Sequence, residues 1–542
     1  MVTHPHLLVV RLRDPRVGTG GRIATESALL AQTYADWTRV DGPAGPLPAG
    51  LFGLPADPVV PDDAADVVVV TVPDGAVLVP DALARIADAA RTGARLVTWD
   101  LDADPAPGDP APAGQDGSPA ANGVVAAIGL RWRRRAGRPA DGLPGPRPLL
   151  RFGWSPEALL SADYPHGLVA LRLEDYRAAA AAVPGGVPLC TWSLLLHLPV
   201  DLEPTVHLAL PLARVPAPAE VDDGTARAVV DAGLRWRGVP ARCERSAGTT
   251  RLRWTPDRWP TVTVIVPTRH NEPMLGPLLE TLRLTEGPRF DVIVVDNGGR
   301  TPEHEAWYER DHGFPLRVNW WEETPFHYGR VNNAAVAQTG SDVVVLLNDD
   351  TRVLDPGWLA ELVGLATMPG VGVAGTALLD ADGKLQHAGV WLGLGGFAGH
   401  LFGGLRPGDD TLLGPTSWYR NTLAVTAACL AVRREHYLQV GGLDELMVMC
   451  GSDVTLGLDQ VALGRRNVCS PLPGVSHLES VTRSSAPLND QLVSLVRYQP
   501  WHDAGDPYGN PRLSLRSVRP RLRADGETDP VADVRTRLGV SL

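Results

Sequence analysis

The chain has 542 residues, which is too long for one ordinary domain. Apolar residues make up 44% and charged residues 21% of the sequence, a composition typical of globular proteins rather than of disordered or fibrous chains. The formal net charge of -12 argues against a general nucleic-acid binder, which would carry a basic face.

The sequence shows no apolar run approaching ~20 residues, so we expect no membrane-spanning helix. Arg11 and Arg13 follow the first short apolar run, which argues against a secretory signal. We therefore expect the chain in the cytoplasm, and a peripheral contact with the inner face of the membrane stays open. The five cysteines show no paired spacing, which indicates buried thiols rather than disulfides or a zinc site.

Residues 1–200 alternate apolar runs with helical patterns, and Ile23–Ala31 and Ala82–Ala90 carry helical spacing. The stretch Asp102–Gly123, rich in Pro, Gly and Ala, is expected to be a mobile surface loop. Three mostly apolar runs predict buried parallel strands: Leu7–Val10, Val67–Val72 and Leu96–Trp99.

A connector over residues 201–259 is expected to lead to a clearer unit over residues 260–485, with a C-terminal extension over residues 486–542. In the clearer unit, Leu275–Leu284 has helical spacing. Strands alternating with helices indicate a doubly wound α/β sheet, in which ligands collect beyond the carboxyl ends of the strands. The expected strands are Thr261–Val266, Asp291–Val295 and Asp342–Leu347.

The third of these strands ends in Asn348, Asp349 and Asp350. Two adjacent carboxylates at a sheet edge suit a divalent cation that bridges a diphosphate. Mg²⁺ or Mn²⁺ fits such a site, whereas Ca²⁺ needs more oxygen ligands. The alternative is a turn and helix cap, because Asp and Asn are common after strands.

Three further groups are candidates for chemistry. Asp296 begins an Asp-Asn-Gly-Gly run, which is either an Asx turn or a site where the carboxylate binds a base or ribose. Asp453 is either a general base or a helix N-cap. His477 is either a metal ligand or an ordinary histidine. No Walker P-loop occurs in the sequence.

A series of motifs runs in order through residues 260–485: Val264–Arg269, Val294–Gly298, Pro325–Asn333, Leu347–Thr351, Leu385–Val390, Arg420–Asn421, Ala424–Cys429, Gly441–Glu445 and His477–Arg483. Their order and spacing resemble those of family 2 glycosyltransferases with a GT-A fold. The resemblance is to the branch found in O-antigen, rhamnan and other cell-envelope polysaccharide clusters.

This resemblance implies inverting transfer of a sugar from a UDP- or dTDP-sugar to a glycan or lipid-linked acceptor, with Mn²⁺ or Mg²⁺ as cofactor. It implies Asp453 as the base and Asp350 with His477 as metal ligands. The residues implied to bind the nucleotide sugar are Pro267, Thr268, Arg269, Asp296, Asn297, Asn333, Asn348 and Asp349. Those implied to line the acceptor or sugar pocket are His387, Arg420, Asn421, Thr426 and Ser452. Ser452, Thr455 and Asp459 depart from the residues that the family places around the base.

The first segment resembles the same family more faintly, through Glu26–Trp37, Val72–Leu78 and Arg151–Leu160. We therefore expect two tandem GT-A-like (Rossmann-like α/β) domains that arose by duplication, the first of them degenerate. The degenerate copy keeps one acid, Asp74, at the metal motif. Two other functions stay open: a glycoside hydrolase that uses the paired carboxylates, and a non-catalytic carbohydrate-binding or assembly subunit.

Overall fold

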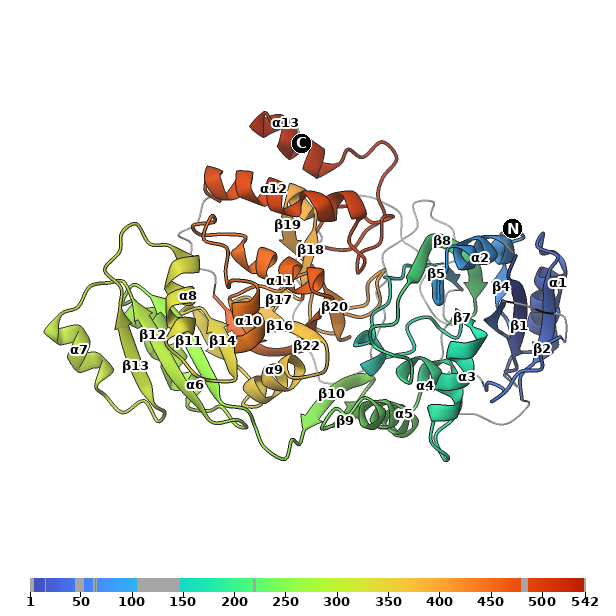
Figure 1. Cartoon of the computed structure of the whole chain (residues 1–542), viewed down its shortest axis with the longest axis horizontal. Helices are drawn as coiled ribbons and strands as arrows, with labels where there is room; N and C mark the ends of the chain where they lie inside the picture. Colours follow the sequence, from blue (N-terminus) through green and yellow to red (C-terminus); the bar gives the residue numbers. More distant parts are fainter. Residues whose placement is uncertain are drawn as a thin grey trace, which may run out of the picture.

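The computed structural model contains two large β-sheets, one in each half of the sequence (Figure 1). The structure describes residues 4–14, 16–43, 53–61, 64, 66–104, 147–217, 221–478 and 486–540. The expected loop after Asp104 and the last motif after Leu478 lie outside the described residues.

The first sheet has the strand order β2-β1-β3-β7-β5-β8-β4, with β6 paired to β5. Its strands are β1 (His6–Leu12), β2 (Trp37–Asp41), β3 (Val67–Pro73), β4 (Val77–Leu78), β5 (Leu96–Ala103), β6 (Arg147–Leu149), β7 (Ala170–Arg172) and β8 (Thr205–Val215). The three predicted strands are present as β1, β3 and β5. β7 pairs antiparallel with both β3 and β5, so the sheet is mixed rather than all parallel.

Helices cover both faces of the first sheet because its strands are apolar on both sides. Leu7 and Val9 of β1 pack with α1 (Thr19–Leu30) and α2 (Ala82–Arg91), which correspond to the two predicted helices. Leu8 and Val10 point to the opposite face, where α3 (Leu173–Ala182) and α4 (Thr191–Leu196) lie.

The second sheet has the order β13-β12-β11-β14-β21-β16-β22-β15, with β17 on β16 and β20 on β22. Its strands are β11 (Val262–Thr268), β12 (Phe290–Asp296), β13 (Leu316–Trp320), β14 (Val343–Leu347), β15 (Thr351–Val353), β16 (Val371–Leu379), β17 (Leu385–His387), β20 (Arg420–Thr422), β21 (Cys429–Arg433) and β22 (Arg466–His477). The predicted strands β11, β12 and β14 are parallel, and β21 then pairs antiparallel with β14. This sheet too is mixed.

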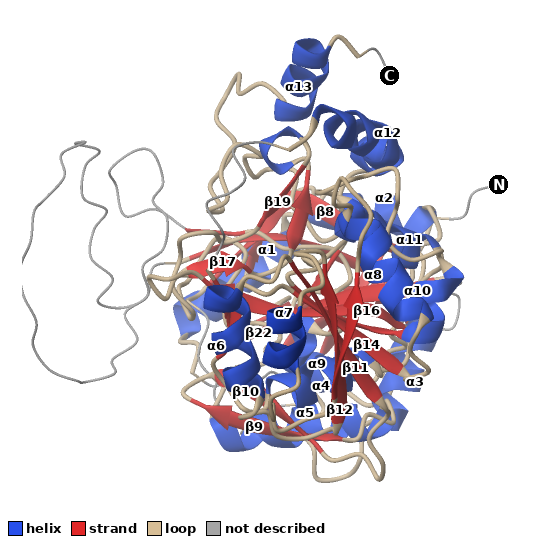
Figure 2. Cartoon of the chain, turned by 90° about the vertical axis from the view of Figure 1, so that its left-hand side faces the viewer, coloured by secondary structure: helices blue, strands red, loops and turns tan. Residues whose placement is uncertain are grey.

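Helices also flank the second sheet on both faces (Figure 2). α6 (Glu272–Leu282) and α9 (Trp358–Ala366) pack on one face. α8 (Tyr328–Ala337), α10 (Arg434–Gln439) and α11 (Ser452–Ala462) pack on the other. The remaining elements are α5 (Asp223–Trp236), β9 (Ala241–Ser246), β10 (Thr249–Trp254), α7 (Pro302–Tyr308), β18 (Val390–Leu392), β19 (Ala398–His400), α12 (Leu488–Ala504), α13 (Pro530–Leu538) and the short 3-10 helices η1 (Ala158–Leu160) and η2 (Leu394–Gly396).

The two sheets have the same topology. β2, β1, β3, β7, β5, β8 and β4 take the places of β12, β11, β14, β21, β16, β22 and β15, and each pair has the same relative direction. β6 on β5 likewise matches β17 on β16. An internal duplication accounts for this strand-by-strand match.

The pairing register shows what the first copy has at the metal position. The pairings β5–β7–β3 and β5–β8–β4 of the first sheet can be superposed on the pairings β16–β21–β14 and β16–β22–β15 of the second. In this alignment the residues of β3 and β4 match those of β14 and β15 without a gap. Asp74 then corresponds to Asp349, and Gly75 corresponds to Asp350. Asp74 was expected at the position of the metal-binding acid, but the alignment places it one residue earlier, and Gly75 occupies that position. Asp74 is buried and pairs with Arg11 at 2.7 Å instead.

The two halves of the chain share one apolar core. A continuous cluster of buried side chains runs from Leu8 in β1 through Leu160 and Leu194 to Val264 and Val345 in the second sheet. Separating the sheets would expose this surface to water, which is unfavourable in proportion to its apolar area.

A buried ion pair crosses the same interface. The Glu157 carboxylate is 0% exposed and accepts a hydrogen bond from Arg466 Nη2 at 3.0 Å. Asn421 Nδ2 donates to the other carboxylate oxygen at 2.7 Å. Burial by itself would raise the pKa of Glu157, but the Arg466 charge and these hydrogen bonds outweigh it, so the pKa lies below its usual range.

Two boundaries differ from those that the sequence suggests. β8 carries the first sheet to Val215, beyond residue 200, so the connector begins later and consists of α5 and the β9–β10 hairpin. Residues 486–540 are not an appended extension, because Asn510 Nδ2 donates to Asp100 Oδ1 of β5 at 2.8 Å. The C-terminal segment is thereby fixed to the first sheet.

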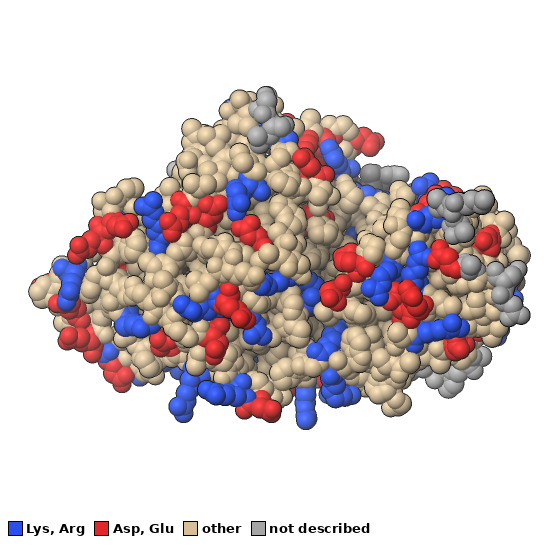
Figure 3. All heavy atoms as spheres, viewed as in Figure 1, with Lys and Arg blue, Asp and Glu red and all other residues tan. Residues whose placement is uncertain are grey.

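Acidic and basic side chains are interspersed on the face seen in Figure 3. Within the described ranges, no helix is long and apolar enough to cross a membrane.

We predict that Glu157→Gln lowers the free energy of unfolding by roughly 3 kcal/mol, because Arg466 keeps its charge in a buried site without its partner. The pKa of Glu157 is lowered on folding, so its contribution is present above about pH 4.3 and is lost as the pH falls through the folded-state pKa. Chemical denaturation at pH 7 and pH 3.5 measures both effects.

Glu244→Gln is the matched control, because Glu244 pairs with Arg253 at an exposed site where such pairs contribute little. Equal losses in the two variants at pH 7 would contradict the role assigned to the buried pair.

Candidate functional site

A cavity of about 660 Å³ opens beyond the carboxyl end of β14. We call it the strand-end cavity. It brings together six of the residues singled out from the sequence: Asn348, Asp350, Thr426, Ser452, Asp453 and His477. Since these residues come from four different parts of the second unit, their convergence depends on the fold rather than on sequence proximity.

Asp350 and His477 face each other in this cavity. β15 pairs antiparallel with β22, which places Thr351 opposite His477, and His477 Nε2 lies 3.1 Å from Asp350 Oδ1. His477 Nδ1 lies 2.7 Å from Gln386 Oε1, which can only accept, so Nδ1 carries the proton. The lone pair of a neutral His477 at Nε2 therefore points toward Asp350.

This pair fits a divalent ion. Two ligands at adjacent corners of an octahedron about 2.1 Å from Mg²⁺ are separated by about 3.0 Å, close to the observed spacing. Gln386 supplies the outer contact that commonly orients a metal-binding histidine. In the described part of the chain no group of three or more His, Cys, Asp or Glu residues could hold a metal ion.

Asp349 points to a different partner. Its Oδ2 accepts a hydrogen bond from Thr268 Oγ1 at 2.7 Å, which ties the end of β14 to the end of β11. Burial raises the pKa of Asp349, and the nearby Asp350 charge adds to this rise. A divalent ion beside Asp350 would oppose the second effect.

Asp453 lies in the first turn of α11. The N-cap residue is Gly451, at φ 94°, so the interpretation of Asp453 as the N-cap is wrong. Asp453 Oδ2 accepts from Ala427 N at 3.0 Å and Oδ1 accepts from Val454 N at 2.9 Å. These two backbone contacts orient the Asp453 carboxylate at the wall of the cavity.

The opposite wall of the cavity is α12, which the sequence did not connect with the site. Asp490 is 1% exposed, and its carboxylate accepts backbone N–H groups of Val448, Met449 and Cys450 at 2.8, 2.8 and 3.0 Å. Tyr498 Oη donates to Gly451 O at 3.2 Å. α12 therefore holds the loop that leads directly into Asp453. A lone Asp in a helical segment carries no motif that would have indicated this.

Asp296 is completely buried, and its carboxylate is already occupied. Its Oδ2 lies 2.6 Å from the donating hydroxyl of Tyr308 and 2.9 Å from His270 Nδ1, and its Oδ1 accepts from Gly298 N at 2.7 Å. Burial, together with the hydrogen bond to Asp296, raises the pKa of Tyr308. His270 and Tyr308 were not found from the sequence.

Other nucleotide-site candidates lie around this carboxylate. Asn297 N donates to Thr268 O at 2.9 Å, Pro267 is buried in β11 and Arg269 is exposed. Asn333 is used to hold the fold. Its Nδ2 donates to Leu443 O and its Oδ1 accepts from Leu443 N, both at 2.9 Å.

Three of the five candidates for the acceptor or sugar pocket do not line the strand-end cavity. Asn421 lies in the interface between the two sheets, where Ser155 Oγ donates to its Oδ1 at 2.7 Å. His387 is buried behind Thr426, and burial, followed by the charges of His400 and His477, lowers its pKa, so the ring is neutral.

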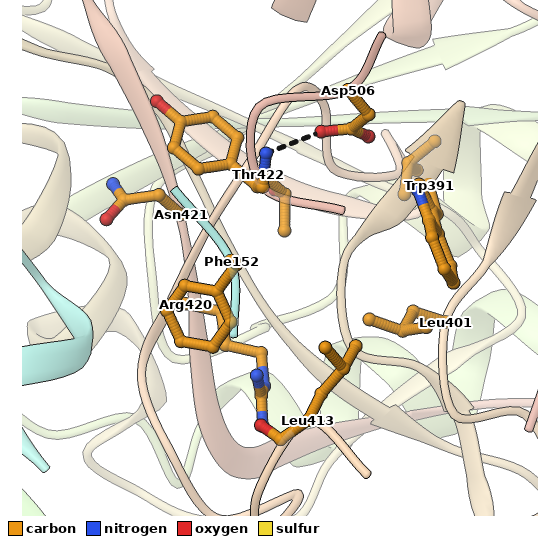
Figure 4. Close-up of a pocket in the computed structure, with 10 residues that line it drawn as sticks. Phe152, Trp391, Leu401, Leu413, Arg420, Asn421, Thr422 and Asp506 are labelled. Carbon is orange, nitrogen blue, oxygen red and sulfur yellow. Dashed lines mark hydrogen bonds between the residues drawn. The ribbon is translucent and has the colours of Figure 1, made fainter. Parts of the chain in front are cut away.

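Arg420 lines a separate cavity of about 20 Å³, room for about one water molecule (Figure 4). It extends past Phe152 and donates to Leu413 O at 3.1 Å. Burial lowers the pKa of Arg420 to about 9. Its contacts with Phe152 of the first half of the chain and Leu413 of the second indicate a packing role.

Comparisons with known proteins find similarity over part of this chain. Residues 263–437 match the model of the family described as Glycosyl transferase family 2. The chain is 36% identical over 409 residues to the O-antigen biosynthesis protein RfbC of Myxococcus xanthus, covering 72% of this chain and 32% of that protein. This chain thus spans about a third of that relative's length.

Two further similarities involve named transferases. The chain is 27% identical over 246 residues to N-acetylglucosaminyl-diphospho-decaprenol L-rhamnosyltransferase of Mycobacterium tuberculosis, covering 40% of this chain and 75% of that protein. Among solved structures it is similar to the mannosyltransferase PcManGT from Pyrobaculum calidifontis in complex with GDP-Man and Mn²⁺. That match has 18% identity and a TM-score of 0.33, and it covers 52% of this chain and 70% of the other.

We predict that Gln386→Ala weakens Mn²⁺ binding roughly tenfold, because His477 loses the contact that fixes its proton on Nδ1. Electron paramagnetic resonance titration with Mn²⁺ measures the affinity. Gln338→Ala, at an exposed helix end, is the control. Equal affinity in the two variants would show that Gln386 does not orient a metal ligand.

Proposed function

Because residues 263–437 form a glycosyl transferase family 2 domain, we propose that this chain is an inverting, metal-dependent glycosyltransferase. The donor is a nucleotide-diphosphate sugar, UDP- or dTDP-linked, and the acceptor is a glycan or a lipid-linked glycan. The observation that carries the proposal is a single cavity that holds both the Asp350–His477 pair and the Asp453 carboxylate.

In this mechanism Asp453 takes the proton of the acceptor hydroxyl. The acceptor oxygen forms a bond to the anomeric carbon as the bond from that carbon to the diphosphate breaks, so the configuration inverts. Asp350 and His477 would hold Mn²⁺ or Mg²⁺, which neutralises charge on the departing diphosphate. The ends of β11 and β12, which the buried Asp296 holds in place through His270 and Tyr308, would form the nucleotide end of the site.

Two observations support a catalytic rather than a purely binding role. Ser452 lines the strand-end cavity, Thr455 Oγ1 donates to Ser452 O at 2.9 Å, and Asp459 pairs with Arg497 of α12 at 2.8 Å. The three departures from the family are therefore accommodated around Asp453. The names of the relatives favour cell-envelope polysaccharide synthesis as the setting of the reaction.

We predict that Asp350→Asn lowers sugar transfer roughly a hundredfold or more, because the site loses a charged ligand while the shape of the side chain is kept. Release of nucleoside diphosphate, measured over a panel of nucleotide sugars with Mn²⁺ and with Mg²⁺, reports the loss. Asp382→Asn, at an exposed residue away from the cavity, is the control. Full activity of the Asp350→Asn variant in EDTA would refute the metal-dependent mechanism.

We predict that Asp453→Asn lowers transfer by roughly 10²- to 10⁴-fold while donor binding is kept, because Asn can accept the Ala427 hydrogen bond but cannot take a proton. Calorimetric titration with the donor and a transfer assay separate the two effects. Asp459→Asn on the same helix is the control. Loss of donor binding with transfer preserved at high acceptor would reverse the assignment.

A further inference from the structure

A second cavity, of about 440 Å³, lies at the other end of α12. We call it the C-terminal cavity. Its walls come from β18, the last turn of α12, residues 505–515 and residues 523–531. Its volume falls within the range of about 300–1,000 Å³ found for small-molecule sites. The transfer chemistry proposed for the strand-end cavity makes no use of it.

The lining of the C-terminal cavity combines aromatic rings with hydrogen-bonding groups. Trp391 and Trp501 supply indole surfaces, and His502, Arg523 and Thr528 supply polar groups. The His502 Nε2 atom is buried and finds no hydrogen-bond partner among the described residues. Burial lowers the pKa of His502 to about 4, so its ring is neutral at pH 7 and one ring nitrogen can accept a hydrogen bond.

This combination fits a carbohydrate better than the other ligand classes. A sugar ring offers a C–H face that packs on indole and hydroxyl groups that pair with polar side chains. A lipid chain would leave the polar lining without partners. A phosphate would meet the carboxylates of Glu527 and Asp529, which also line the cavity.

The two cavities adjoin along the same elements. α12 lines the strand-end cavity with Gln491, Ser494 and Tyr498, and lines the C-terminal cavity with Trp501 and His502. Tyr498 and His502 are one helical turn apart, with ring centroids separated by 6.3 Å. β18 also contributes to both cavities: Val390 lines the strand-end cavity, and Trp391 and Leu392 line the C-terminal cavity. The two cavities are therefore neighbours along α12 and β18.

The first unit fixes the floor of the C-terminal cavity. Asn510 Nδ2 donates to Asp100 Oδ1 of β5 and to Arg151 O, both at 2.8 Å. Gly153 N donates to Pro507 O at 2.9 Å. Asp100 and Arg151 are both fully or almost fully buried. The first unit, which lacks the metal-site acid, therefore holds the segment around Pro507 and Asn510 that lines the C-terminal cavity.

We propose that the C-terminal cavity is a subsite for sugar units of the acceptor glycan, next to the unit that receives the transferred sugar in the strand-end cavity. This inference rests on the function proposed above. It assigns to the first unit the role of holding the acceptor subsite in place.

The test uses a substitution that adds a bulky side chain to the lining of the C-terminal cavity. Ala504 lines the C-terminal cavity at the exposed end of α12, so Ala504→Trp puts an indole into the cavity without removing a contact. Ala532→Trp, at an exposed position of α13 outside the cavity lining, is the matched control. The probes are fragments of one to eight sugars released by mild acid from the surface polysaccharide of the source organism.

We expect Ala504→Trp to raise the KM for fragments of several sugars roughly tenfold relative to Ala532→Trp, with kcat unchanged, because uniform binding is lost. The KM for a single sugar should differ less than about twofold between the variants. Equal KM values at every fragment length would overturn the proposal. A parallel fall in donor hydrolysis in Ala504→Trp would also overturn it, because the two cavities would then not act separately.

A binding readout separates this proposal from the proposed function. Saturation-transfer NMR with the same fragments, in the absence of donor, should show binding to the parent and to Ala532→Trp and weaker binding to Ala504→Trp. If no nucleotide sugar is turned over by the parent, the proposed transferase activity fails, but this pattern would still support a glycan site. Equal fragment binding by the two variants would refute the glycan site whatever the transfer assay shows.

Discussion

A carboxylate removed from water must find hydrogen-bond donors, and in this molecule three buried carboxylates find them on distant parts of the chain. Glu157 takes Arg466 and Asn421 from the other sheet. Asp100 takes Asn510 from the C-terminal segment. Asp490 gathers three backbone amides before α11. Because each would be costly to bury alone, these contacts fix how the two sheets and the C-terminal segment meet.

The duplicated topology has diverged in chemistry while its hydrogen-bonded frame has stayed the same. A strand needs an apolar face and a partner, and many sequences meet that requirement. A metal site needs particular acids at particular positions. Gly75 at the position of Asp350 removes the site without disturbing the β3–β4 connection, and Asp74 forms an internal pair with Arg11. What the first copy retains is a rigid sheet, and its Asp100 holds the C-terminal segment beside the second copy.

Local pattern was sufficient to predict three strands of each sheet: β1, β3 and β5 in the first, and β11, β12 and β14 in the second. Short apolar runs such as Val343–Leu347 are buried on both faces, and the polar residues that end them collect at one edge, as parallel pairing requires. That rule placed Asp350 at the ligand-binding edge of the sheet, whereas the role of Asp453 was implied by the resemblance to family 2 glycosyltransferases. It did not predict β21, whose antiparallel pairing with β14 depends on a return of the chain from a distant segment. The role of His477 as a metal ligand was implied by the same resemblance of sequence motifs.

The sequence by itself determined the elements and the acids at their ends, since hydrophobic spacing and strand-end chemistry are local properties. Only the tertiary structure decided which polar side chains serve the site and which serve packing. Asn421, Arg420 and Asn333 are polar residues in shared motifs, yet their donors and acceptors are used within the interior. α12 showed the opposite case, a segment without a motif that closes the cavity. The physical reason is that a hydrogen bond is made with whatever group the fold brings within reach, and that partner lies tens or hundreds of residues away.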